Sequence, residues 1–198
     1  MGFSDLKIND KVVIFTPLES QNPSEIIQFC DRNIGEGYFT AEDIETIRLQ
    51  SEKDGKNCSF LAYHDNEIIG IRFTYAPGKD WSVLFDENDL LVDRWPGAKK
   101  QAAYFKSLYI DQKYQGLGIG QALSNKSIQV IKQLGGRFII SHCWKESPNN
   151  SSQRYFSKMN FESIGEHPKF WSKIDYNCTR CQRPPCQCTA LEMVRILD

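Results

Sequence analysis

The sequence lacks any apolar run of about 18 residues, the length that suggests a membrane-spanning helix. Its first ten residues also lack the apolar core that a signal peptide requires. We therefore expect a cytoplasmic protein that has no membrane partner.

An excess of positive charge is also missing, because 24 Lys and Arg residues face 25 Asp and Glu residues, for a net charge of -1. Non-specific binding of nucleic acid needs a positive field, so we expect neither DNA nor RNA as a partner. No internal repeat or low-complexity segment is visible. With 198 residues, 40% of them hydrophobic, the chain is long enough for one substantial core. We expect a single domain over residues 1–198 and leave a homodimer open.

Apolar spacing and turn residues predict several strands and helices. Two β-rich runs, residues 59–64 and 68–75, are separated by Asp65 and Asn66, which favours a hairpin. Thr40 and Asp43 approximate a capping box that begins a helix. The other expected strands are 12–15, 104–110, 138–144, 161–164 and 190–197, and the other expected helices are 24–33, 119–134 and 149–159.

Residues 76–101 interrupt this pattern with two Pro-Gly pairs, which predicts an inserted loop that can hold a helical turn. Acidic side chains gather in the loop, and they either form solvated surface or steer a cationic amine toward a site. They are Asp86, Glu87, Asp89 and Asp93.

A glycine-rich turn at residues 115–120 lies between an expected strand and an expected helix. Backbone N–H groups at a helix start can hold a phosphate, and glycines let an anion approach closely. A P-loop is excluded because it needs Gly-Lys followed by Ser or Thr, whereas Gly118 and Gly120 are followed by Ile119 and Gln121. A dinucleotide-binding fingerprint is excluded as well. It would need a third glycine at the position of Gln121 and an acidic residue near Ile140, and the sequence has neither. A tight turn without a ligand remains an alternative.

The pattern Gln115-x-x-Gly118-x-Gly120, directly after a strand that ends Leu108-Tyr109-Ile110, resembles the GNAT superfamily of acyl-CoA N-acyltransferases. The resemblance spans about residues 59–161. It implies an α/β fold with a mixed, mostly antiparallel central sheet that is flanked by helices and splayed at the acyl-CoA site. The implied activity is transfer of an acetyl group from acetyl-CoA to an amine acceptor of unknown identity.

The resemblance also implies how the coenzyme is held. Backbone amides of residues 115–120 would bind the pyrophosphate, and the backbone of residues 108–110 would pair with the pantetheine arm and stabilise the oxyanion. The implied coenzyme-binding residues are Leu108, Tyr109, Ile110, Gln115, Gly116, Leu117, Gly118, Ile119, Gly120 and Asn149.

The position that the family usually gives to a proton-donating tyrosine falls on Phe156, and Asn160 stands where glycine is usual. Tyr155, one residue away, is the candidate acid, although on an ideal helix it points about 100° aside. The alternatives are an ordinary, partly buried tyrosine and a mechanism without a side-chain acid.

His142, at the end of an expected strand, is the candidate base because imidazole titrates near neutral pH. A structural histidine is the alternative, and Tyr104, Glu146 or a chain of waters could also accept the proton. Cys143 lies in an apolar strand, and we expect it to be a buried, inert thiol.

Four of the seven cysteines fall between the last two expected strands, as Cys178-x-x-Cys181 and Cys186-x-Cys188. In a reducing compartment such a set suits tetrahedral zinc, here as a structural knuckle over residues 178–188. Free thiols or labile disulfides remain alternatives.

Two rival functions stay open at this point. A catalytically silent acyl-CoA sensor would keep the glycine turn and explain Phe156. A zinc-knuckle interaction protein would leave the turn empty.

Overall fold

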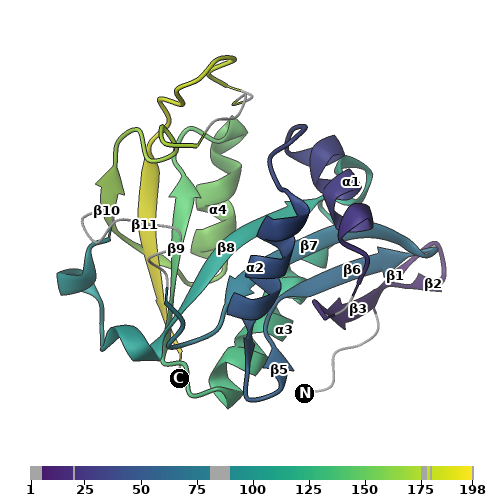
Figure 1. Cartoon of the computed structure of the whole chain (residues 1–198), viewed down its shortest axis with the longest axis horizontal. Coiled ribbons are helices and arrows are strands. Elements are labelled where there is room, and N and C mark those ends of the chain that lie inside the picture. Colours follow the sequence, from purple (N-terminus) through teal and green to yellow (C-terminus); the bar gives the residue numbers. More distant parts are fainter. Residues whose placement is uncertain (1–5, 20, 81–89, 175–177, 179, 198) are drawn as a thin grey trace. The chain divides into compact units, whose positions relative to one another are not determined.

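The computed structural model describes residues 6–19, 21–80, 90–174, 178 and 180–197. A seven-stranded sheet runs in the order β10-β11-β9-β8-β7-β6-β3 (Figure 1). Its β8–β9 pair is parallel, whereas the β10–β11, β11–β9, β3–β6 and β6–β7 pairs are antiparallel. The predicted fold class is therefore confirmed. The strands are β3 Ile14–Pro17, β6 Phe60–His64, β7 Glu67–Tyr75, β8 Ala102–Ile110, β9 Phe138–Trp144, β10 Glu162–His167 and β11 Ala190–Ile196.

The chain forms two compact units, which are described separately. The first comprises Met1–Tyr75 and Lys106–Gln133, and the second comprises Ala76–Phe105 and Leu134–Asp198.

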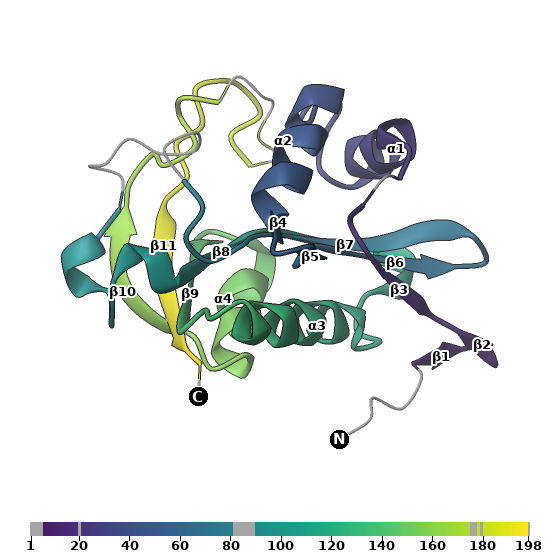
Figure 2. The ribbon, with the colours of Figure 1, turned by 60° about the horizontal axis from the view of Figure 1, so that its bottom comes forward.

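In the first unit, helices cover both faces of the β6–β7 hairpin. Helices α1, Pro23–Asn33, and α2, Ala41–Ser51, lie on one face, and α3, Ile119–Gln133, lies on the other (Figure 2). Helix α2 begins with the predicted capping box, since Thr40 Oγ1 accepts a hydrogen bond from the Asp43 amide and the Asp43 carboxylate accepts one from the Thr40 amide. The predicted hairpin turn is confirmed as well, because Asp65 and Asn66 both have positive φ.

The face of β7 that meets α3 requires a glycine. A Cβ added at Gly70 would lie 2.7 Å from Ile110 Cδ1 and 3.3 Å from Leu123 Cδ1. The missing side chain therefore lets α3 and the end of β8 pack closely on β7. Leu123 and Ile119 are fully buried in this part of the core.

The expected strand over residues 12–15 is wrong in its bounds. The chain instead forms β2, Lys11–Val12, which pairs with β1, Lys7–Ile8, and it then enters β3 at Ile14. Between the two strands the buried Val13 donates its N–H to the Leu6 carbonyl. A second short hairpin, β4 Glu52–Lys53 and β5 Lys56–Asn57, follows α2 and was not predicted.

In the second unit, α4, Ser151–Lys158, packs on β9, and β11 lies between β9 and β10 (Figure 1). The described part of the expected loop over residues 76–101 contains two 3₁₀ turns, η2 Val92–Arg94 and η3 Lys99–Gln101. The expected helix over residues 149–159 begins later than predicted. Asn149 and Asn150 both have φ of 53°, a left-handed conformation that a helix interior does not allow, so a turn at Pro148–Asn150 precedes α4.

Candidate active site

In the first unit, the chain leaves β8 and enters α3 through the 3₁₀ turn η4, Gln112–Tyr114, and the glycine turn, residues 115–118. Two contacts anchor this connection, the first to β7 and the second to the end of β8. The Asp111 amide donates to the Ile69 carbonyl at 3.0 Å, and the Gln115 side-chain amide donates to the Ile110 carbonyl at 3.1 Å. Gln115 therefore holds the turn against the strand that precedes it.

The glycine turn is open. Residues 115–118 are exposed, and Gly116 and Gly118 have φ of 79° and 83°. A Cβ added at either glycine would meet nothing within 4 Å. Within the described part of the chain, the amides of residues 116–119 donate to no acceptor. The turn thus presents several free donors at the start of a 15-residue helix, where the helix dipole favours an anion.

The three residues that end β8 are held by their side chains. Leu108 and Ile110 pack against the cluster that contains Ile119 and Leu123. Burial raises the pKa of Tyr109 well above its ordinary value, so the phenol stays protonated. These contacts hold the side chains in place. The expected pairing of this backbone with the pantetheine arm would require such a fixed strand.

The parallel ladder between β8 and β9 covers the first part of each strand. Ala102–Phe105 of β8 pair with Phe138–Ser141 of β9, and the remaining residues of both strands lie beyond the ladder.

In the second unit, His142 belongs to a buried chain of polar groups. Tyr104 Oη lies 3.0 Å from His142 Nδ1, and His142 Nε2 lies 3.7 Å from Glu192 Oε2. The ring of His142 also stacks on Phe170, at 4.1 Å between centroids. The His142 side chain is 1% exposed, so it has almost no direct contact with solvent.

Glu192 lies at the centre of this polar chain and is fully buried. Its carboxylate accepts hydrogen bonds from Trp95 Nε1 at 2.6 Å, His167 Nε2 at 2.7 Å and the Leu91 amide at 3.0 Å. Burial alone would raise the pKa of Glu192, but these bonds and the adjacent His142 ring outweigh it and hold the pKa far below its ordinary value. The carboxylate is therefore ionised.

His142, His167 and Glu192 do not have the spacing of a metal site. Zinc–nitrogen and zinc–oxygen bonds of about 2.0–2.2 Å place tetrahedral ligand atoms about 3.4 Å apart. The His167 Nε2 and Glu192 Oε2 atoms are 2.7 Å apart, which is a hydrogen-bond distance. His167 and Glu192 are thus joined by a hydrogen bond, and His142 Nε2 lies 3.7 Å from the same carboxylate oxygen.

Sequence reasoning missed Glu192. The one signal was an acidic residue in the otherwise apolar run 190–194. The alternation of apolar and polar residues along a strand does not reveal that the groups around this carboxylate come from β9, β10 and the loop before β8.

Helix α4 explains the departure at Phe156. Phe156 is buried, with its ring 4.9 Å from that of Phe161, which in turn lies 5.8 Å from Phe105. The phenylalanine at this position therefore packs in the aromatic core. Tyr155 is half-buried on the same helix, and Asn149 is exposed on the turn before it.

Three other residues that sequence analysis singled out have structural surroundings. Burial raises the pKa of the Cys143 thiol, which donates to Ser152 Oγ and stays protonated. The Glu146 carboxylate accepts the Thr189 amide, at 2.9 Å and 3.1 Å. Asp93 is exposed on η2, whereas Asp86, Glu87 and Asp89 lie outside the described residues.

Comparison with known proteins identifies the family. The family model for GNAT acetyltransferases matches residues 25–161, more than half of the chain. The chain belongs to the GNAT acetyltransferase family. This confirms the resemblance that the glycine turn indicated, and it makes transferase chemistry the family-level activity.

The individual relatives are distant. An uncharacterized N-acetyltransferase of Methanocaldococcus jannaschii is 30% identical over 76 residues, which are 38% of this chain and 32% of that protein. The match therefore spans only about a third of the relative's length.

Solved structures share the fold at low identity. The ribosomal-protein-S18-alanine N-acetyltransferase of Escherichia coli has a TM-score of 0.64 at 11% identity, covering 94% of this chain and 95% of its own. A chain of the NatC complex bound to Gag peptide and CoA has a TM-score of 0.66 at 14% identity, covering 94% and 99%. An N-acetyltransferase from Staphylococcus aureus has a TM-score of 0.63 at 16% identity, covering 94% and 99%. None of the helices in the described residues has the length and apolarity needed to traverse a bilayer.

Proposed function

We propose that this GNAT protein transfers an acetyl group from acetyl-CoA to an amine. The observation that carries the proposal is the open glycine turn, whose amides at residues 116–119 point to no acceptor among the described residues at the start of α3. Converging N–H donors and a helix dipole suit a pyrophosphate. The residues assigned to the pyrophosphate are Gln115, Gly116, Leu117, Gly118, Ile119 and Gly120.

In this proposal, the backbone of Leu108, Tyr109 and Ile110 binds the rest of the coenzyme together with Asn149. An amide N–H of the strand that ends at Ile110 would stabilise the oxyanion. The bound thioester supplies an activated acyl carbon. The protein supplies orientation, a proton acceptor for the amine and a proton donor for the thiolate.

We assign the proton acceptor to His142, with Tyr104 as the group through which the proton passes. The 3.0 Å contact between Tyr104 Oη and His142 Nδ1 supports this role, and the ionised Glu192 on the other side of the ring would stabilise a protonated imidazole. We assign the proton donor to Tyr155, the half-buried tyrosine beside Phe156.

The family match over residues 25–161 includes parts of both compact units. We therefore propose one acyltransferase domain over the whole chain. The cytoplasmic location stays a prediction.

The function is tested with the full chain by calorimetry with CoA and by turnover of acetyl-CoA with a panel of small amines and peptide N-termini. We expect binding with 1:1 stoichiometry and release of free CoA with at least one amine. No heat of binding at millimolar CoA would contradict the proposal. Binding without turnover on any amine would instead favour an acyl-CoA sensor.

The two side chains assigned to proton transfer make separable predictions. Tyr155→Phe should lower kcat by about 100-fold without changing the KM for acetyl-CoA, since it removes only the donor to the thiolate. His142→Gln should lower kcat/KM by a similar factor at pH 7. That loss should shrink above about pH 9, where a larger share of the free amine has already lost its proton.

Tyr63→Phe is the matched control, because Tyr63 is a half-buried tyrosine on β6, and we expect its kinetics to be unchanged. Equal kcat for Tyr155→Phe and wild type would remove Tyr155 from the mechanism. A loss in His142→Gln that persists at high pH would assign His142 a purely structural role.

A further inference from the structure

We propose that the chain binds one structural zinc ion through Cys178, Cys181, Cys186 and Cys188. These four residues, here called the cysteine knuckle, lie on the segment between β10 and β11 in the second unit (Figure 1). The acyltransferase chemistry proposed above does not use them.

The sulfur positions fit one tetrahedral ion. A zinc–sulfur bond of about 2.3 Å places the four sulfurs of a tetrahedron about 3.8 Å apart. The Sγ atoms lie 3.8 Å apart for Cys178 and Cys188, 3.7 Å for Cys181 and Cys188, and 4.0 Å for Cys181 and Cys186. All four lie within 4.8 Å of one another, which leaves room for one ion at their centre and none for a cluster of several irons.

The same distances argue against disulfides. A disulfide has a sulfur–sulfur bond of about 2.05 Å and joins two cysteines exclusively. Cys181 instead stands almost equally far from Cys186 and Cys188, and Cys188 is equally close to Cys178. Cys181 and Cys188 therefore each have two sulfurs at similar distances.

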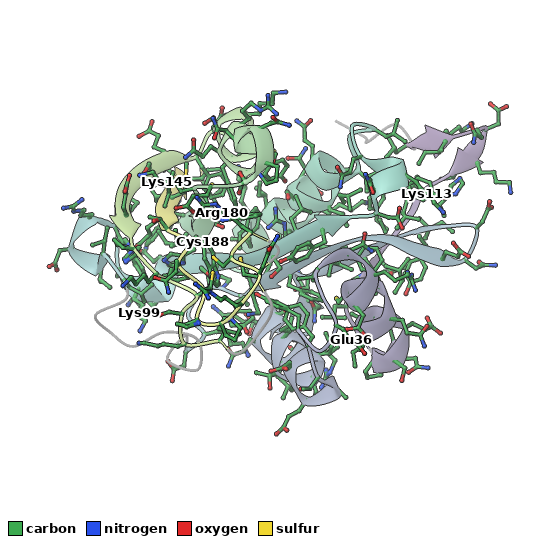
Figure 3. All side chains as sticks on the ribbon, turned by 90° about the horizontal axis from the view of Figure 1, so that it is seen from above. Glu36, Lys99, Lys113, Lys145, Arg180 and Cys188 are labelled. Atoms are coloured by element: carbon green, nitrogen blue, oxygen red, sulfur yellow. The ribbon has the colours of Figure 1, made fainter. Side chains whose placement is uncertain are left out.

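The local backbone turns toward the sulfurs. The amides of Arg180 and Cys181 donate to Cys178 Sγ, and the Gln187 amide donates to Cys181 Sγ at 3.3 Å. Hydrogen bonds of this kind stabilise a thiolate, the form that binds metal. The Arg180 side chain also bonds to Cys188 and supplies a positive charge beside the sulfurs (Figure 3). Four thiolates around one divalent ion carry a net charge of about -2, so a nearby cation is favourable.

The knuckle is built into its surroundings. Cys178, Cys186 and Cys188 are buried, and Trp144 and Trp171 pack against them. Four thiolate ligands leave no open coordination position, which is typical of a structural site.

Two backbone hydrogen bonds and one ring contact show what the ion would hold in place. The Lys145 amide donates to the Thr189 carbonyl at 3.0 Å, which joins the knuckle to the end of β9. The Phe170 amide donates to the Cys188 carbonyl at 3.1 Å, and the Phe170 ring stacks on His142. Zinc would therefore fix the segment that carries Phe170, and through it the wall beside His142. The role of His142 rests on the proposed function, but the metal site does not.

The test is the metal content of the full chain after dialysis, with Cys181→Ser and Cys143→Ser as a matched pair. We expect about one zinc per chain in wild type and in Cys143→Ser, whose altered thiol lies outside the knuckle. Cys181→Ser, which changes the half-exposed ligand, should retain almost none because a serine hydroxyl does not replace a thiolate at a soft site.

A second measurement does not depend on the variants. Replacing zinc by Co²⁺ in the wild-type chain should produce the visible bands of tetrahedral cobalt and the near-ultraviolet charge-transfer band of thiolate ligands. Absence of both zinc and the cobalt spectrum would overturn the proposal, as would equimolar iron. A mass deficit from disulfides, or equal zinc loss in Cys143→Ser, would overturn it too. None of these outcomes depends on acetyl-CoA, so a failed metal site and a failed transferase assignment are distinguishable.

Discussion

Gly118→Leu should weaken CoA binding by at least about 100-fold, equivalent to about 2.7 kcal/mol. Gly118 has φ of 83°, and a Cβ at this position would point into space that no neighbour occupies. In the proposed complex that space belongs to the pyrophosphate. A leucine side chain would fill it and keep the anion away from the amides, which is measured by calorimetry with CoA.

The control for Gly118→Leu is Gly55→Leu. Gly55 has φ of 69°, stands at the turn of the β4–β5 hairpin in the same unit and likewise has nothing within 4 Å of the position that a Cβ would take. Both substitutions place a side chain in the left-handed region, at a cost of about 1–2 kcal/mol of unfolding free energy. Only Gly118→Leu should lose CoA. Unchanged affinity in Gly118→Leu would show that the pyrophosphate lies elsewhere.

Glu192→Gln should lower the free energy of unfolding by roughly 3 kcal/mol at pH 7, because a buried, ionised carboxylate becomes a neutral amide among donors that favour an anion. Trp95, His167 and the Leu91 amide all donate to this carboxylate in the second unit. Chemical denaturation followed by fluorescence measures the loss.

The advantage of wild type over Glu192→Gln should also depend on pH. The pKa of Glu192 is lowered in the folded state, whereas the unfolded chain has a glutamate pKa of about 4.3. Above about pH 4.3 both states are ionised, and the full advantage is present. Below it the unfolded chain binds a proton that the folded chain does not, so the advantage falls by about 1.4 kcal/mol per pH unit toward the folded-state pKa.

Glu166→Gln is the control for Glu192→Gln. Glu166 is also a glutamate of the second unit, but its partner is the exposed Lys145, and its own side chain is 51% exposed. We expect a change within about 0.5 kcal/mol. A similar loss in both variants, or a Glu192→Gln loss that stays constant down to pH 3, would contradict the ionised state of Glu192.

Short-range chemistry made much of the fold predictable. Thr40 and Asp43 form a cap within four residues, and Asp65 and Asn66 make a turn from their own backbone preferences. The glycine turn is equally local, since Gly116 and Gly118 adopt positive φ at the strand-to-helix junction where the pattern indicated an anion site. Features of this kind need no knowledge of the rest of the chain.

Predictions from apolar runs failed where a contact from another segment redirects the backbone. The run over residues 12–15 was expected to be one strand, but Val13 is drawn into the core and bonds to Leu6 between two strands. Periodicity also placed Asn149 inside a helix, although the left-handed conformation of Asn149 and Asn150 delays α4 until Ser151.

The sequence alone was enough for the family, the position of the glycine turn and the presence of four neighbouring cysteines, because each depends on residues close together along the chain. The folded molecule was needed to show that Glu192 joins His142 and His167, that Phe156 serves an aromatic core, and that the four sulfurs lie at the spacing of one tetrahedral ion. Those properties arise when strands pair and side chains far apart in the sequence are buried together. The local conformational preferences of residues do not determine which segments come into contact.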